Sequence, residues 1–207
     1  MSDAVYDLIN AYRDRLTGQG GAPALQLAGA FDRIDAKFRP PGSDPILESA
    51  LETAAKVFDG QPDILADAIS AAPPETAQLA AMIGALADHV TWCEGPREGA
   101  PDGLEGAYAY VILVGPNGHV DAPDCRMGVY LQPPGIHYPA HAHDAEEFYL
   151  IISGKADWQA GERSFTAEPG HVIHHAPAES HVMTTTDTAL LGCWAWQGDI
   201  MGDYWWG

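Results

Sequence analysis

The second half of the chain is a series of short apolar runs separated by turn-forming residues, and this pattern restricts the fold more than any other feature. Each run is rich in β-branched and aromatic residues and is bounded by Gly, Pro, Asn or Asp. The runs lie at residues 108–114, 128–132, 147–153, 171–174, 181–185 and 190–196. Such runs are typical of β-strands, and many short strands with regular turns indicate a β-sandwich or a β-barrel.

The first ninety residues follow a helical period instead. Val5, Leu8 and Tyr12 recur at the spacing of one apolar face of an amphipathic helix. Further helices are expected at residues 24–36, 44–58, 62–71 and 79–90. Because the apolar faces are one-sided and no Gly/Ser- or Pro-rich linker follows, we expect an α+β protein. In it, a helical extension over residues 1–104 packs on a β-barrel over residues 105–207.

The chain is strongly acidic, since its 207 residues include 10 Lys and Arg against 29 Asp and Glu, a net charge of −19. Nucleic acid and anionic membranes are therefore disfavoured as partners, whereas a small cationic or zwitterionic molecule is favoured. The first residues lack the basic and apolar regions of a signal peptide, and no stretch approaches the ~20 apolar residues of a membrane span. Three widely spaced cysteines, Cys93, Cys125 and Cys193, are expected to be reduced packing residues in a cytoplasmic protein. A homodimer is compatible with the sequence.

Seven of the nine histidines lie between His137 and His181. Successive side chains on a strand point to opposite faces. His141 and His143 therefore share one face, and Glu147 and Tyr149 likewise share one face. Two imidazoles and a carboxylate suit a divalent metal with open coordination positions, with iron, zinc and manganese as candidates. His181, at the start of a later strand, is the candidate fourth ligand. Structural or surface roles are expected for His89, His119, His137, His171, His174 and His175.

The spacing Gly-x5-His-x-His-x3-Glu-x6-Gly over residues 135–154 resembles the first sequence motif of the cupins. Gly161, Pro169-Gly170 and His181 keep the order of the second cupin motif with a longer spacing before the histidine. This resemblance implies a small antiparallel double-stranded β-helix with a metal inside the barrel. With the helical extension and the aromatic C-terminal segment, the whole chain resembles the bacterial dimethylsulfoniopropionate lyases of the cupin superfamily, the DddQ type in particular.

The resemblance implies a β-elimination that converts dimethylsulfoniopropionate, a zwitterion with a carboxylate and a sulfonium, into acrylate and dimethyl sulfide. One divalent metal would act as a Lewis acid on the carboxylate. Tyr149 would be the base, because a nearby dication favours a phenolate, and Tyr138 would orient the substrate. Trp194 and Trp196 share a strand face, against which a sulfonium would gain about 0.5–2 kcal/mol per contact.

Several alternatives remain open at this stage. A cupin dioxygenase with Fe(II) on the same ligands would consume oxygen and need no phenolate, and a non-catalytic ligand-sensing cupin would turn nothing over. Tyr149 and Tyr138 could serve packing or hydrogen bonding alone, and the tryptophan pair could be core. His141 would leave the metal if Tyr149 took its coordination position.

Overall fold

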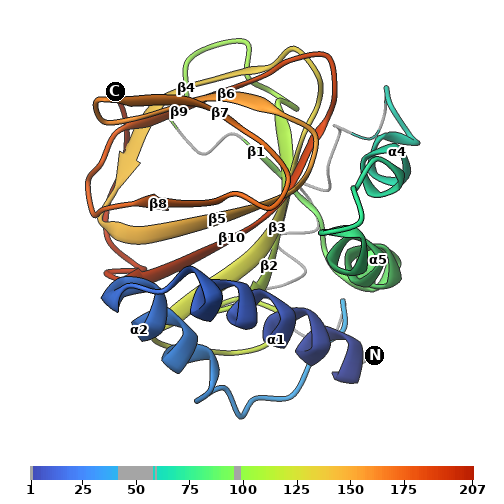
Figure 1. Ribbon diagram of the computed structural model, residues 1–207, viewed down its shortest axis with the longest axis vertical. Coiled ribbons are helices and arrows are strands. Elements are labelled where there is room, and N and C mark those ends of the chain that lie inside the picture. Colours follow the sequence, from blue (N-terminus) through green and yellow to red (C-terminus); the bar gives the residue numbers. More distant parts are fainter. Residues whose placement is uncertain (1, 42–57, 59, 96–98) are drawn as a thin grey trace.

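The computed structural model describes residues 2–41, 58, 60–95 and 99–207, which form helices on one side of a barrel of two antiparallel sheets (Figure 1). The helices are α1 (Ser2–Gln19), α2 (Ala22–Phe31), α4 (Ile64–Ser70), α5 (Ala77–Leu86) and the 3-10 helix η2 (Ala87–His89). The strands are β1 (Cys93–Gly95), β2 (Tyr108–Val114), β3 (Cys125–Gln132), β4 (His137–His143), β5 (Ala145–Ser153), β6 (Ala156–Ala160), β7 (Arg163–Ala167), β8 (Val172–His175), β9 (His181–Thr185), β10 (Leu190–Gly198) and β11 (Tyr204–Trp206).

The two sheets have the orders β1-β2-β3-β10-β5-β8 and β11-β4-β9-β6-β7. Every pairing between two of the described strands is antiparallel, and strands far apart in sequence lie side by side, such as β3 with β10 and β4 with β9. The sheets face each other (Figure 1). The protein is therefore α+β with a cupin fold, as the sequence predicted.

All six predicted strand runs are strands, and four helices match predicted ones. Strand β3 begins three residues earlier than expected, β8 is shifted to end at His175, and α2 ends at Phe31 rather than at residue 36. The helix expected at residues 44–58 falls on residues 42–57, outside the described part of the chain, except for its last residue. Strand β4 was expected only through the pair His141 and His143, and the short strands β1, β6, β7 and β11 were not predicted.

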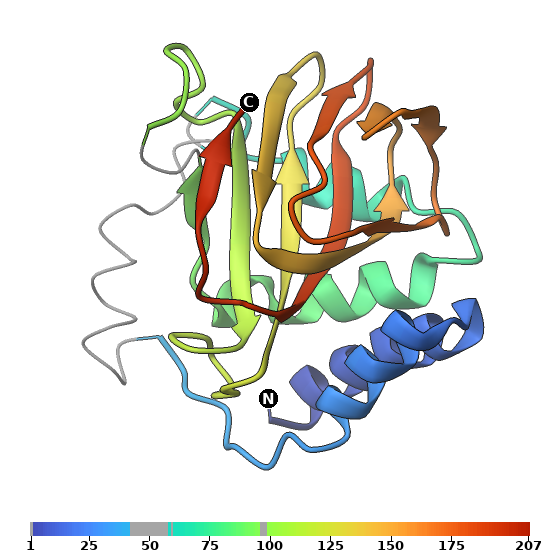
Figure 2. The same cartoon turned by 90° about the vertical axis from the view of Figure 1, so that its left-hand side faces the viewer.

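The helices cover the outer face of the six-stranded sheet, beneath the barrel (Figure 2). The predicted stripe of α1 is fully buried and joins one continuous apolar core with the sheet residues Leu113, Phe148 and Leu150. Burial of this kind contributes roughly 25 cal/mol per Å² of apolar surface. The helical part therefore packs on the barrel and shares its core.

Buried hydrogen bonds reinforce this packing. The Tyr12 hydroxyl donates to the carbonyl oxygen of Phe148 at 2.9 Å, and the Thr76 hydroxyl donates to that of Ile152 at 2.6 Å. In the reverse direction, the Ser153 hydroxyl donates to the Ala68 carbonyl oxygen at 2.6 Å. Strand β1, which precedes the predicted boundary at residue 104, also pairs with β2 inside the barrel sheet.

The residue that follows strand β5 must be glycine for a steric reason. Gly154 has φ +77°, and a Cβ there would lie against the carbonyl oxygen of Ala189. Only glycine adopts this conformation without strain, so the last Gly of the 135–154 motif fixes the turn that leads β5 into β6.

The three cysteines are buried and are not joined by disulfides. None of the helices that the structure describes is long and apolar enough to span a membrane.

Candidate metal centre and substrate pocket

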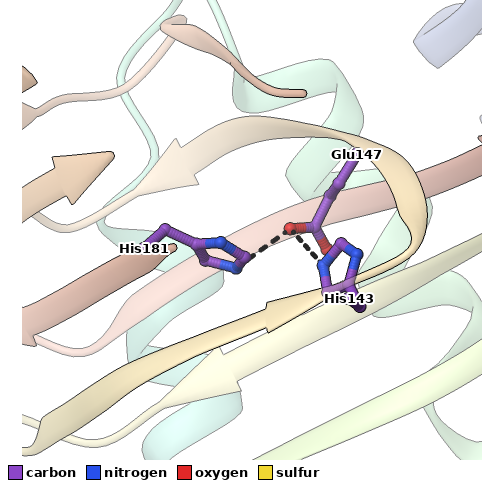
Figure 3. A group of neighbouring side chains, drawn as sticks. All are labelled: His143, Glu147 and His181. Carbon is purple, nitrogen blue, oxygen red and sulfur yellow. Dashed lines mark hydrogen bonds and ion pairs between the residues drawn. The ribbon is translucent and has the colours of Figure 1, made fainter. Parts of the chain in front are cut away.

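Three of the four predicted metal ligands converge inside the barrel. His143 at the end of β4, Glu147 on β5 and His181 at the start of β9 each offer one ligand atom, and these atoms all lie within 4.8 Å of one another (Figure 3). Glu147 Oε2 lies 3.3 Å from His143 Nε2 and 3.3 Å from His181 Nε2. All three side chains are buried.

Backbone carbonyls set the tautomers of these histidines. Nδ1 of His143 donates to the Ala145 carbonyl oxygen, and Nδ1 of His181 donates to that of Glu179, each at 2.9 Å. With the proton on Nδ1, the Nε2 atom of a neutral imidazole presents a lone pair. In neutral rings, both lone pairs therefore point at the same oxygen of Glu147, toward which Figure 3 shows the two rings turned.

A cation satisfies this arrangement. Two donor atoms held about 2.1 Å from one ion at a tetrahedral angle lie about 3.4 Å apart, close to both 3.3 Å separations. The buried Nε2 of His181 forms no hydrogen bond with any residue that the structure describes, and such groups are rare in native proteins. A donor set of two imidazoles and a carboxylate fits a divalent transition metal.

The ionisation states of His181 and Glu147 are those that a divalent metal requires of its ligands. Burial, the first cause, and the neighbouring His175 and His141 hold the pKa of His181 well below its usual value, so its ring is neutral at neutral pH. Burial, the first cause, would raise the pKa of Glu147, but the neighbouring histidines, among them His175 with its Nδ1 contact to Oε2, hold it well below the usual range, so the carboxyl group is ionised. The site thus combines the neutral imidazole of His181 with an ionised carboxylate.

His141, the fourth predicted ligand, lies beside the other three. It pairs with His181 across β4 and β9, and the two ring centroids are 4.0 Å apart. Its Nδ1 donates to the Pro139 carbonyl oxygen at 2.9 Å, so this ring has the same tautomer as the other two. Burial lowers the pKa of His141 to about 4. Its ligand atom is not among those within 4.8 Å of one another.

An aromatic pocket opens next to this cluster. It contains all four residues predicted to act on substrate, namely Tyr138, Tyr149, Trp194 and Trp196. Tyr149 and Trp194 lie opposite each other across β5 and β10, and the two tryptophan rings meet edge to face at 5.6 Å. The lining residues, all within the described chain, include no lysine or arginine.

The pocket also contains four tyrosines that were not predicted as site residues: Tyr108, Tyr110, Tyr130 and Tyr204, the last of which belongs to the aromatic C-terminal segment. The Tyr138 hydroxyl is hydrogen-bonded to that of Tyr108 at 3.1 Å and to that of Tyr204 at 2.7 Å. Tyr204 belongs to the short C-terminal strand β11, whose pairing with β4 has no sequence signal beyond the aromatic run itself.

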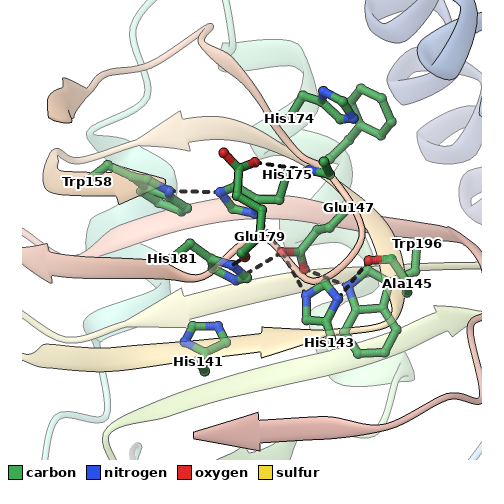
Figure 4. A network of polar contacts seen from close by, with 12 residues as sticks. His141, His143, Ala145, Glu147, Trp158, His174, His175, Glu179, His181 and Trp196 are labelled. Atoms are coloured by element: carbon green, nitrogen blue, oxygen red, sulfur yellow. Dashed lines mark hydrogen bonds and ion pairs between the residues drawn. The ribbon is translucent and has the colours of Figure 1, made fainter. Parts of the chain in front are cut away.

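Glu147 is held by two further residues (Figure 4). Trp196 Nε1 donates to its Oε1 at 2.6 Å, and His175 Nδ1 is 2.9 Å from its Oε2. His175 was expected to have a structural role, and the structure places it within the cluster. The run 171–175 contains three histidines and two adjacent aliphatic residues, so alternation alone did not show which histidine faces inward.

These observations define a cupin barrel with a candidate metal centre beside an aromatic pocket. A sequence model of the dimethylsulfoniopropionate lyase family matches residues 59–192. The chain is 30% identical over 147 residues to the dimethylsulfoniopropionate lyase DddQ of Ruegeria pomeroyi, and the aligned region covers 70% of each protein. It is 28% identical over 198 residues to a Cereibacter sphaeroides protein that carries the lyase name DddL, and this alignment covers 84% of this chain and 82% of that protein.

The fold comparison agrees. The crystal structure of DddQ from Ruegeria pomeroyi superposes with a TM-score of 0.69 at 20% identity, covering 100% of this chain and 97% of that one. The chain therefore belongs to the dimethylsulfoniopropionate lyase family, a family of carbon–sulfur lyases, as its resemblance predicted.

Proposed function

We propose that this protein cleaves dimethylsulfoniopropionate to acrylate and dimethyl sulfide with the help of one divalent transition metal and Tyr149. The observation that carries the proposal is the pair of imidazole Nε2 atoms that face one carboxylate oxygen, beside an aromatic pocket, in a chain of this family.

His143, Glu147 and His181 would hold the metal, with His141 or Tyr149 as a further ligand. When bound, the cation supplies Lewis acidity, which stabilises negative charge on the substrate carboxylate and favours the phenolate of a nearby tyrosine. The experiment below tests which of iron, zinc and manganese restores activity to the metal-free protein.

The pocket walls would bind the sulfonium end of the substrate. The faces of Trp194 and Trp196 are apolar and electron-rich, and each contact with a cation contributes about 0.5–2 kcal/mol. No lysine or arginine is among the described lining residues; the Arg126 guanidinium lies 5.7 Å from the centroid of the Trp196 ring, so among the described residues Trp194 offers the sulfonium the ring without a neighbouring cation. Tyr138, held by the hydroxyls of Tyr108 and Tyr204, would orient the substrate.

Tyr149 would remove the proton. Burial, and then the Glu147 carboxylate, raise the pKa of Tyr149 well above its usual value, so its hydroxyl keeps its proton unless positive charge is brought close. As a phenolate, Tyr149 Oη takes the proton from the carbon next to the substrate carboxylate. The C–H electron pair becomes the double bond of acrylate, and the electrons of the C–S bond leave with dimethyl sulfide.

The test measures dimethyl sulfide in the headspace over purified protein and dimethylsulfoniopropionate. We expect release by the purified protein, loss after treatment with a chelator, and recovery when Zn²⁺, Fe²⁺ or Mn²⁺ is added back. Release that is insensitive to chelation would contradict metal dependence. Oxygen uptake without dimethyl sulfide would favour a dioxygenase instead.

A further inference from the structure

His175 lies at the centre of a buried chain of hydrogen bonds behind the candidate metal centre. Its Nδ1 is 2.9 Å from Glu147 Oε2, and its Nε2 is 3.0 Å from the indole Nε1 of Trp158 (Figure 4). The side chain is 0% exposed, and Trp158 is 2% exposed. Both contacts are therefore shielded from water.

The indole determines which nitrogen of His175 carries the proton. An indole N–H can only donate, so Nε2 of His175 must accept from Trp158, and the proton of the neutral ring must be on Nδ1. The N–H on Nδ1 then donates to Glu147 Oε2. Trp158 thus gives His175 the tautomer that lets it bind the carboxylate.

His175 also contacts a second candidate ligand. Its ring stacks on that of His181 with the centroids 3.9 Å apart and the planes 14° apart. The strand register places His175 directly opposite Glu147 across β8 and β5. One side chain therefore fixes the carboxylate by a hydrogen bond and one imidazole by its flat face.

We infer that His175, set by Trp158, is a positioning residue that holds Glu147 and His181 in the geometry required for metal binding. This inference rests on the proposed function, since it assigns the metal to that cluster. Hydrogen-bond partners of metal ligands typically account for about 10- to 100-fold in metal affinity. His175 does this without being a ligand, because both of its nitrogens are already engaged.

The neighbouring histidine provides a matched control. His174 lies on the same strand with its side chain on the other face, where its Nε2 is 2.8 Å from Glu146 Oε1. It stacks on Phe148 at 4.7 Å. His174 and His175 thus each contact a glutamate of β5 across the same pair of strands, but only His175 faces the candidate metal centre.

The experiment compares full-length wild type with His175→Phe, His175→Asn, Trp158→Phe and His174→Phe. Zn²⁺ affinity is measured by competition with a chromophoric chelator, and the visible absorption of the Co²⁺-loaded proteins reports ligand geometry. We expect His175→Phe, which keeps a ring but loses both hydrogen bonds, to weaken Zn²⁺ binding by about 10- to 100-fold and to change the Co²⁺ spectrum. Trp158→Phe should weaken binding less, because a neutral His175 can still adopt the correct tautomer.

The remaining variants separate positioning from packing. His175→Asn keeps an N–H donor where Nδ1 stands and should retain most of the affinity, and His174→Phe should match wild type. Wild-type affinity and spectrum in both His175→Phe and Trp158→Phe would overturn the inference while leaving the metal site intact. If wild type itself bound no Zn²⁺ or Co²⁺, the proposed metal site would fail, and the inference with it. Should His175→Phe not fold, as judged by circular dichroism, Trp158→Phe and His175→Asn decide the outcome.

Discussion

Two adjacent glutamates on strand β5 show how differently the two faces of one strand are used. Glu146 points toward the helices, where Gln197 Nε2 donates to it at 2.6 Å and also donates to the Pro23 carbonyl oxygen at the start of α2. Glu147 points into the barrel, where Trp196 and His175 hold it. The side chains are 18% and 3% exposed.

The comparison shows that the two faces of β5 serve different purposes: side chains on one face stabilise the fold, and side chains on the other face form the candidate metal centre. On the outer face, the donors around Glu146 tie the sheet to a helix. On the inner face, the donors around Glu147 still leave one of its oxygens facing two imidazole lone pairs, an arrangement that a cation completes. Substitutions on the outer face should therefore change the stability of the fold, and substitutions on the inner face should change activity and metal binding.

The largest effect is expected when the helices that pack on the outer face of the six-stranded sheet are removed. Deleting residues 1–90 would expose the sheet face around Leu113, Phe148 and Leu150, which is buried in the shared core. We expect the shortened protein to aggregate, measured as loss of soluble protein and by light scattering. A soluble and fully active barrel would show that the helices are not required and would break the comparison.

The inner face is tested by Tyr149→Phe, which removes the hydroxyl and keeps the ring. Loss of a general base typically lowers turnover by about 10²- to 10⁴-fold, and we expect a fall of at least this size with an unchanged melting temperature. The wild-type rate should rise with pH, because higher pH favours the phenolate. The control is Phe148→Leu on the outer face, which should lower stability and leave turnover close to normal. Near-normal turnover in Tyr149→Phe would remove the tyrosine from the base role.

A smaller effect is expected where one hydrogen bond joins helix to sheet. Tyr12→Phe leaves the buried Phe148 carbonyl oxygen without its donor, which should cost about 1–3 kcal/mol of unfolding free energy. Urea unfolding measures this loss. Thr17→Ala on the same helix removes an exposed hydrogen bond to the Arg13 carbonyl oxygen and should change stability little. Equal effects of the two substitutions would count against the packing described here.

The smallest effect concerns pH and stability at His119. Its Nε2 accepts from the Thr91 amide at 2.8 Å, and its Nδ1 donates to the Arg39 carbonyl oxygen at 2.7 Å. Burial, the main cause, lowers the pKa of His119 below its usual value. The unfolded chain therefore binds this proton more readily, so the stabilisation is complete above about pH 6.5 and is lost as pH falls toward the folded-state pKa.

This is checked with His119→Gln, which keeps an acceptor and a donor but does not titrate. Between about pH 7.5 and pH 5.5, wild type should lose more unfolding free energy than the variant. Parallel losses in the two proteins would show that His119 does not contribute to the pH dependence.

Some features of the fold and of the candidate metal centre can be predicted from the sequence, and others depend on how the strands pair. The helix stripe, the strands β2, β5, β9 and β10, and the group of His143, Glu147 and His181 follow from periodicity, turn residues and the cupin motif. His175 does not, because its face depends on the register between β5 and β8. Tyr204 does not either, because the position of a three-residue strand depends on the strand it pairs with.

The most direct test of the account is the metal content of Glu147→Ala beside that of Glu146→Ala, measured by elemental analysis of the purified proteins. The two substitutions remove the same side chain from adjacent positions on opposite faces of β5. We predict one divalent metal per chain in wild type and in Glu146→Ala, and strong depletion in Glu147→Ala, as in His143→Ala, with all variants folded. Full metal occupancy in Glu147→Ala, or equal depletion in the two glutamate variants, would contradict a metal centre on the inner face.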